Sequence, residues 1–339
     1  MKCCKGKFNR FKFGNIDIGF GNIRKANDTG KGLRVRFIGN GIITSALDGI
    51  LRELSADFVS NGTITSALET IKLLDVDFSG YGVISAELDD LDPDYQAVLN
   101  YATAQGYTLP SESQILLQNQ LVLDLKGDSI WSLLDVFYVY ATNGDSDFAK
   151  INWKNPNANF ASEVNSPTFT IDKGFNGNGS TSYLDTNFSP STHGSNFTQN
   201  DASWFAWAEG ANSSGQFWVG QADGRNGVRL ATSDAQRINS ASNASSSVGV
   251  SSTLSKSHVL FSRSDSSNFE IDITDTVTEV NTNYARTATS TTLTTGNFLV
   301  GSWFGAYANA QCSFFGTGSN LSSKRASLVS NLKTYFDAL

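Results

Sequence analysis

The sequence predicts a mainly β protein with a repeat-bearing N-terminal region, a small helical segment and a C-terminal antiparallel sandwich that ends in a helix. One phrase occurs three times near the N-terminus, starting at Phe37, Phe58 and Phe78, which are 21 and 20 residues apart. A period near twenty residues indicates stacked units that bury their apolar faces against one another. From residue 143 onwards, short β-type runs alternate with turn clusters rich in Ser, Thr, Asn and Gly. Many short strands at such spacing indicate a sandwich.

Residues 1–36 are expected to form a basic anchoring arm. Ten Lys and Arg residues fall here, although the whole chain has a net charge of −7. Such an arm can dock onto an acidic protein or onto nucleic acid. The interleaved Phe and Ile residues favour a protein partner over nucleic acid, and the plain alternative is a solvated tail. The residues expected to anchor the arm are Lys5, Lys7, Phe8, Arg10, Phe11, Lys12 and Phe13.

Residues 37–91 form the predicted β-repeat region. In each copy an aromatic-led segment meets Asn-Gly or Tyr-Gly and then a β-branched run, and Asn40-Gly41 is the typical hairpin signal. The pieces between copies, 48–56 and 69–75, are compatible with short helices or further strands. Because such strands lack partners within one copy, we expect a homo-oligomer, with a trimer as the first guess.

Residues 92–142 are predicted to be a helical linker. Asp92 and Pro93 are typical of a helix start, and Gly106 ends the helix predicted over 94–105. A second helix begins at Ser111, which makes a capping box with Gln114, and it ends at Gly127. The apolar stretch over 130–140 must be buried and is interpreted as the hinge to the next domain.

Residues 143–339 form the predicted sandwich. An amphipathic helix is expected over 323–339, with its apolar residues in one stripe. The strands are expected at 169–171, 183–186, 202–208, 216–220, 228–231, 258–263, 269–273, 297–301 and 311–317.

Several segments, in order, resemble the concanavalin A-like, laminin-G-like jelly-roll family. They are FNGNGSTSYLD (175–185), ASWFAW (202–207), the pair of strands over 258–273, FLVGS (298–302) and FFGTGSNLSS (314–323). The complete layout resembles phage virion proteins such as spikes, head fibres and tail-associated adhesins. That resemblance implies a structural protein of the particle surface whose last domain is lectin-like.

Glycan recognition requires a flat aromatic ring to stack on a sugar, with amides and carboxylates for its hydroxyls. Trp153, Trp218 and Trp303 lie near Asn-, Gln- and Gly-rich loops, and Arg225 and Asn226 form a predicted loop tip. These five residues are the candidate glycan site. The alternative for each Trp is burial in the core.

One acidic strand bears on catalysis. Glu270, Asp272 and Asp275 resemble the acidic strand of laminarinase-type glycosidases, but Asp275 is one methylene shorter than the third acid of that motif. We therefore expect a protein that is not an enzyme.

No cofactor is expected apart from a possible structural Ca²⁺. With only His193 and His258, no Cys/His metal site can be built. Residues 143–147 resemble part of a calcium loop but lack its distal Glu, and no ligand set is assigned.

The function expected from these observations is a virion spike or fibre component. Its N-terminal region would contact other virion proteins, and its sandwich would bind a host-surface glycan. A purely architectural capsid or vertex protein and a glycan hydrolase are the alternatives. Because the sequence shows neither a signal peptide nor a transmembrane run, localisation on the virion surface is expected.

Overall fold

The computed structural model describes ten short strands within residues 11–87, and then residues 91–209, 218–229, 236–241, 256–303 and 305–339. Within these ranges, side chains are described from residue 91 onwards, with the exception of those of Trp218, Arg229 and Gln236. The chain divides into two compact units, Met1–Leu91 and Asp92–Leu339, and each is considered by itself.

In the first unit, every repeat contributes one strand to each of two sheets. Equivalent strands of successive repeats pair in parallel and in register, so that Gly41, Gly62 and Gly82 are aligned across one sheet. The parallel strands of that sheet are β6 (Gly41–Leu47), β8 (Gly62–Leu68) and β10 (Gly82–Glu87). The parallel strands of the other sheet are β5 (Leu33–Ile38), β7 (Leu54–Phe58) and β9 (Leu74–Phe78).

The hairpins predicted at the Asn-Gly pairs are therefore wrong. The strand before Asn40-Gly41 pairs with β7 of the next repeat, and the strand after it pairs with β8. Near-identical segments stack best on one another, and this repeat-to-repeat pairing outcompetes a local turn. The undecided pieces between copies end in strands β7 and β9.

The predicted basic arm contributes four short strands, of which three pair antiparallel with the stack and the first pairs antiparallel with the second. β2 pairs with β6, and β3 and β4 both pair with β5. Their bounds are β1 (Phe11–Phe13), β2 (Ile16–Gly19), β3 (Asn22–Ile23) and β4 (Asn27–Asp28). Lys5, Lys7, Phe8 and Arg10 lie outside the described residues, as do the side chains of Phe11, Lys12 and Phe13.

The second unit opens with the two predicted helices, which are confirmed. α1 (Pro93–Gln105) is capped by Asp92, whose Oδ1 accepts from the amide of Asp94 at 3.0 Å, and it stops at Gly106 with φ 75°. α2 (Glu112–Gly127) has Ser111 as its N-cap. Both helices belong to the same compact unit as the sandwich, rather than to a separate linker.

Two antiparallel sheets form the predicted sandwich, which is confirmed. The large sheet has the order β13-β14-β26-β16-β20-β21-β22, with β11 also paired to β26. Its strands are β11 (Leu134–Val139), β13 (Thr168–Thr170), β14 (Gly174–Asn176), β16 (Ala202–Glu209), β20 (Lys256–Arg263), β21 (Asn268–Asp275), β22 (Asn281–Thr287) and β26 (Gln311–Gly318).

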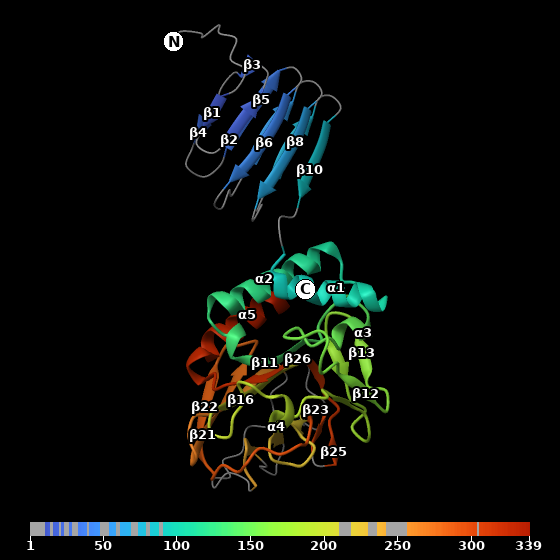
Figure 1. Cartoon of the computed structure of the whole chain (residues 1–339), viewed down its shortest axis with the longest axis vertical. Helices are drawn as coiled ribbons and strands as arrows, with labels where there is room; N and C mark the ends of the chain where they lie inside the picture. Colours follow the sequence, from blue (N-terminus) through green and yellow to red (C-terminus); the bar gives the residue numbers. More distant parts are fainter. Residues whose placement is uncertain are drawn as a thin grey trace. The chain divides into compact units, whose positions relative to one another are not determined.

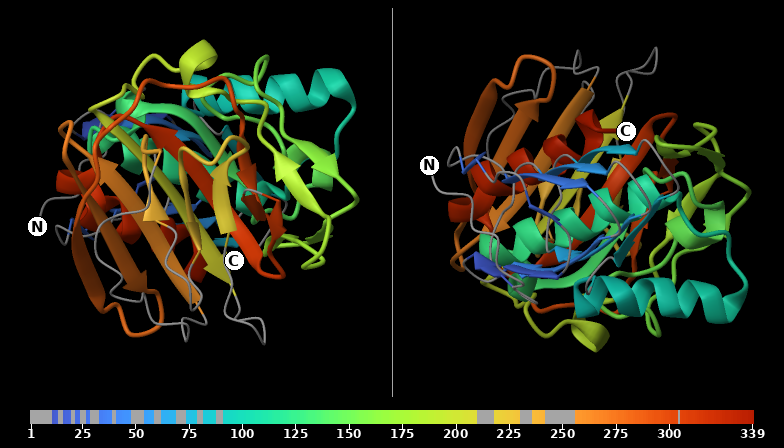
Figure 2. Two further views of the ribbon diagram at one scale, coloured as in Figure 1. Left: turned by 90° about the horizontal axis from the view of Figure 1, so that it is seen from below. Right: turned by 90° about the horizontal axis from the view of Figure 1, so that it is seen from above.

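The small sheet has the order β12-β15-β23-β17-β18-β19. Figure 2 (left) shows these short strands in front of the long strands of the large sheet. They are β12 (Ser162–Val164), β15 (Tyr183–Asp185), β17 (Trp218–Gln221), β18 (Gly227–Arg229), β19 (Gln236–Arg237) and β23 (Phe298–Val300). The remaining elements are the hairpin β24 (Ser302–Trp303) and β25 (Ala306–Tyr307), the short helices η1 (Trp131–Leu133), α3 (Ser146–Ala149), α4 (Pro190–His193) and η2 (Ser322–Lys324), and the terminal helix α5 (Arg325–Asp337).

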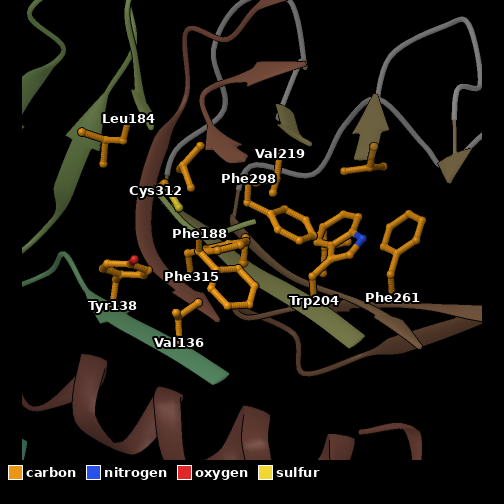
Figure 3. Packing of buried hydrophobic residues seen from close by; sticks show 14 of the residues in the cluster. Val136, Tyr138, Leu184, Phe188, Trp204, Val219, Phe261, Phe298, Cys312 and Phe315 are labelled. Carbon is orange, nitrogen blue, oxygen red and sulfur yellow. The ribbon is translucent and has the colours of Figure 1, made fainter. Parts of the chain in front are cut away.

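The main core lies between the two sheets (Figure 3). Trp204 stacks on Phe261 with ring centroids 4.2 Å apart, and Phe298 of the small sheet meets Phe315 of the large sheet at 5.5 Å. Alternate residues of each strand face this core, as the pleat requires.

The opposite face of the large sheet is buried as well, because α1, α2 and α5 lie against it (Figure 1). Trp207 and Phe314 alternate with core residues and meet Phe336 of α5 at 5.9 and 6.4 Å. Double burial explains why the stretch over 130–140 is apolar without alternation. That stretch is strand β11 with its flanks, and not a hinge.

Candidate functional site

The outer face of the small sheet gathers aromatic and charged side chains. Leu184, Val219, Val228 and Ile238 point into the core, so their strand neighbours point outwards. We call the resulting surface the small-sheet face. It comprises Tyr183 and Asp185 of β15, Trp303 of β24, Tyr307 of β25, Arg237 of β19 and Arg225 in the turn between β17 and β18.

Tyr183 and Tyr307 form a half-buried aromatic pair. Their ring centroids are 6.0 Å apart and their planes are inclined by 32°. Burial, with further contributions from Asp185 and Tyr307, raises the pKa of Tyr183, so its phenol is neutral at physiological pH. Asp185 lies beside the pair, and its Oδ1 accepts from the amide of Asn187 at 2.8 Å. Rings, hydroxyls and a carboxylate thus share one patch.

Trp303 lies flat on the sheet over two glycines. A Cβ at Gly220 would be 2.0 Å from the indole, and one at Gly227 would be 2.5 Å from it. Arg237 covers the ring with its guanidinium carbon 5.7 Å from the centroid. Only 4% of Trp303 is exposed, and its Nε1 has no hydrogen-bond partner. The indole therefore serves as a support for Arg237, and it does not offer a free ring face to a sugar.

Arg225 and Arg237 place two cations at one end of this face. Burial and the nearby charge of Arg225 lower the pKa of Arg237, although the Arg237 guanidinium stays protonated at neutral pH. Arg237 donates from Nη1 to the carbonyl of Gly224 at 3.0 Å. Arg225 donates from Nη1 to Thr291 Oγ1 at 3.5 Å, and its backbone amide donates to Asp223 Oδ1 at 3.1 Å.

Asn226 belongs to a buried amide network beneath the loops. Its Nδ2 donates to Gln221 Oε1 at 2.6 Å and to Asn239 Oδ1 at 3.2 Å. Its Oδ1 accepts from the amide of Asn239 at 2.9 Å. With 1% of its surface exposed, Asn226 positions the turn that carries Arg225 and does not itself reach a ligand.

The predicted site residues are thus only partly brought together. Trp153 is 1% exposed and packs against Tyr95 and Phe137 on the helical side of the large sheet, so it is removed from the candidate site. Trp218 begins β17, but its side chain lies outside the described residues. Sequence reasoning missed Tyr183, Asp185, Tyr307 and Arg237 as site residues. The alternation in Tyr183-Leu184-Asp185 was the one available signal, because an apolar residue between two polar ones marks a half-exposed strand.

The three acids of β21 do not converge. Glu270 and Asp272 share one face of the strand, as their spacing predicts, and Asp272 is 3% exposed. Its Oδ1 accepts from Asn281 and Asn283 at 3.0 and 3.1 Å. Asp275 accepts from two backbone amides of the following turn, and these bonds lower its pKa. Asp275 therefore serves the turn and cannot complete a triad with the other two.

The calcium-loop resemblance at 143–147 has a structural explanation. Asp145 caps α3 through Oδ1, which accepts from Phe148 at 2.8 Å, and its Oδ2 accepts from Thr108 at 2.6 Å. Within the residues that the structure describes, no cluster of three or more His, Cys, Asp or Glu side chains could hold a metal ion.

None of the helices in the described ranges is both long and apolar enough to span a bilayer.

No family model matches the sequence, and no curated protein matches it. Among solved structures, an arabinofuranosidase bound to arabinofuranosyl-xylobiose is 12% identical over 55% of this chain and 50% of its own, with a TM-score of 0.35. A Trypanosoma rangeli sialidase in complex with sialic acid is 12% identical over 66% of this chain and 39% of its own, with a TM-score of 0.37. The enzymatically active domain of tailspike protein 2 from bacteriophage CBA120 is 10% identical over 89% of this chain and 51% of its own, with a TM-score of 0.26.

This chain therefore spans about half or less of each of these proteins. At these TM-scores the likeness assigns no role to any of its residues. The prediction that the chain is not an enzyme is contradicted, because glycosidases make up much of this set, and it is not retained.

Proposed function

We propose that the second unit binds a glycan through the small-sheet face. The observation that carries this proposal is the Tyr183–Tyr307 pair beside Asp185, with rings and a carboxylate on one outward surface. Half-buried tyrosines offer apolar ring area together with a hydroxyl, and a neighbouring carboxylate accepts sugar hydroxyls. The three long helices α1, α2 and α5 lie against the large sheet (Figure 1), so they do not cover the small-sheet face.

We further propose that the chain is a spike or fibre component of a virion. The parallel stack of the first unit and the basic arm before it would attach to other particle proteins. The sandwich would then meet a host-surface glycan. The parallel in-register stack supports this proposal, since such repeats build extended attachment modules.

A glycan array probed with the full chain tests the binding proposal. The Tyr183→Ala/Tyr307→Ala double variant should lose at least tenfold in affinity, because aromatic stacking contributes about 1 kcal/mol or more per ring. Tyr101→Ala is the matched control, since Tyr101 is a half-buried tyrosine of α1 that pairs with Tyr107. Product analysis in the same wells reports any hydrolysis.

Retention of full affinity by a folded double variant would place the glycan elsewhere and refute this site.

The virion role is tested separately by competition. Purified chain should reduce adsorption of the particle to its host, and a chain that leaves adsorption unchanged at saturating concentration would argue against it.

A further inference from the structure

The arginine end of the small-sheet face carries positive charge on a chain whose net charge is negative. The net charge of the whole chain is −7. In the described parts of the chain, none of the ion pairs involves Arg225. Its guanidinium has one long hydrogen bond, to Thr291 Oγ1 at 3.5 Å, and is half-buried. A guanidinium with so few partners retains most of its five N–H donors for another group.

The backbone around the two arginines is held in place. The carbonyl of Arg225 accepts from the amide of Ser240 at 3.1 Å, and that of Asn226 accepts from the amide of Gln221 at 2.9 Å. Arg237 is supported from below by the indole of Trp303, which in turn rests on glycines. The two cations are therefore oriented before a ligand arrives, which reduces the ordering cost of binding.

We propose that the ligand is an acidic glycan, whose anionic group binds Arg225 and Arg237 while a neutral part of the chain contacts Tyr183 and Tyr307. This inference rests on the proposed glycan-binding function. Four strand spacings separate β15 from β19 in the small sheet, which is roughly 19 Å at ~4.8 Å per strand. A short oligosaccharide spans that length. Carboxylate, sulfate and phosphate groups all fit a guanidinium fork, so the shared chemistry is an anionic oxygen group.

Paired probes that differ only in charge test this inference on the full chain. One pair is tri-galacturonic acid and its methyl ester, and the other is a κ-carrageenan tetrasaccharide, whose only anionic groups are sulfates, and its desulfated form. For at least one pair, the acidic member should bind about tenfold or more tightly than its neutral partner. That preference should shrink as salt rises from about 50 to 300 mM, because screening weakens charge pairs.

Arg225→Gln should remove most of the preference, because glutamine keeps a hydrogen-bond donor but no charge. Lys173→Gln is the matched control, since it removes one exposed positive charge from the large sheet, between β13 and β14. It should leave the preference intact. A folded Arg225→Gln protein that still prefers the acidic members would overturn the inference.

The two proposals fail in different ways. Equal binding of neutral and acidic members, with loss on Tyr183→Ala/Tyr307→Ala, would leave the glycan-binding proposal standing and overturn the acidic ligand. If the protein binds neither acidic probe, the inference of an acidic ligand is overturned as well. Binding of any neutral glycan on the array would still support the glycan-binding proposal. A protein that binds none of the probes and nothing on the array would overturn both.

Discussion

His258 should make the second unit sensitive to acid. It lies in β20 with no exposed surface, and neither ring nitrogen has a hydrogen-bond partner. The rings of Phe205 and Trp207 flank it at 5.9 and 6.2 Å. Burial, with a smaller contribution from the charge of Arg325, lowers its pKa to about 3. The proposed perturbation is His258→Phe, which keeps a ring of similar size and removes the titration.

The expected magnitude follows from the difference in proton binding between the two states. An unfolded histidine has a pKa of about 6.5, so the unfolded chain takes up a proton below that pH while the folded protein does not. The folded state is therefore favoured fully above pH 6.5, and this contribution is lost as the pH falls towards 3. Because pH 5 lies about 1.5 units below the pKa of the unfolded histidine, the unfolding free energy at pH 5 should be lower by about 2 kcal/mol.

Urea unfolding followed by tryptophan fluorescence measures this loss. All six Trp residues lie between Trp131 and Trp303, so the signal reports on the second unit alone. Between pH 7.5 and pH 5, the wild-type chain should lose about 2 kcal/mol more than His258→Phe. The other histidine, His193, is exposed, and His193→Gln should behave as wild type does. Equal losses in wild type and His258→Phe would refute the reasoning.

Three further predictions concern stability. Gly220→Ala should cost about 1–3 kcal/mol, because its Cβ would lie 2.0 Å from the Trp303 ring, whereas Gly127→Ala, with open space around it, should be nearly neutral; thermal unfolding compares them. Arg263→Met should cost about 3 kcal/mol or more in urea unfolding, because the buried guanidinium donates to four backbone carbonyls, and a loss under about 1 kcal/mol would contradict this. Burial lowers the pKa of Lys154 to about 8, whereas the unfolded chain keeps this proton up to about pH 10.5, so the unfolding free energy should rise between these two pH values. Lys154→Met should lack this rise in urea unfolding. If the urea midpoint of Lys154→Met changes with pH as the wild-type midpoint does, the prediction is wrong.

Local signals predicted much of the second unit. The caps at Asp92 and Ser111 and the stop at Gly106 were readable because they depend on residues within one turn of a helix. The strand expected over 202–208 matches β16 because its apolar residues and flanking turns lie in one segment. The hairpins of the first unit were mispredicted because a turn signal does not state which strand will pair with its neighbours.

The candidate site was harder to predict than the fold. Whether a tryptophan faces a ligand depends on what covers it, and Trp153 and Trp303 are covered by residues distant in sequence. Tyr183 and Tyr307 are separated by more than 100 positions, so their pairing had no local signature. The spacing of Glu270 and Asp272 did place both on one face, but it did not reveal the amides that occupy Asp272.

By itself, the sequence determined the mainly β class, the repeat period, the helix boundaries and most strands of the sandwich. These depend on residue patterns over a few positions, where backbone geometry dictates which side chains share a face. Only the tertiary structure decided that the repeats pair in parallel, that one sheet is buried on both faces, and that a pair of tyrosines and a pair of arginines lie on the outer face of the other sheet. The physical reason is that burial and pairing are set by contacts between distant segments, and a local pattern records that a face is apolar but not what it meets.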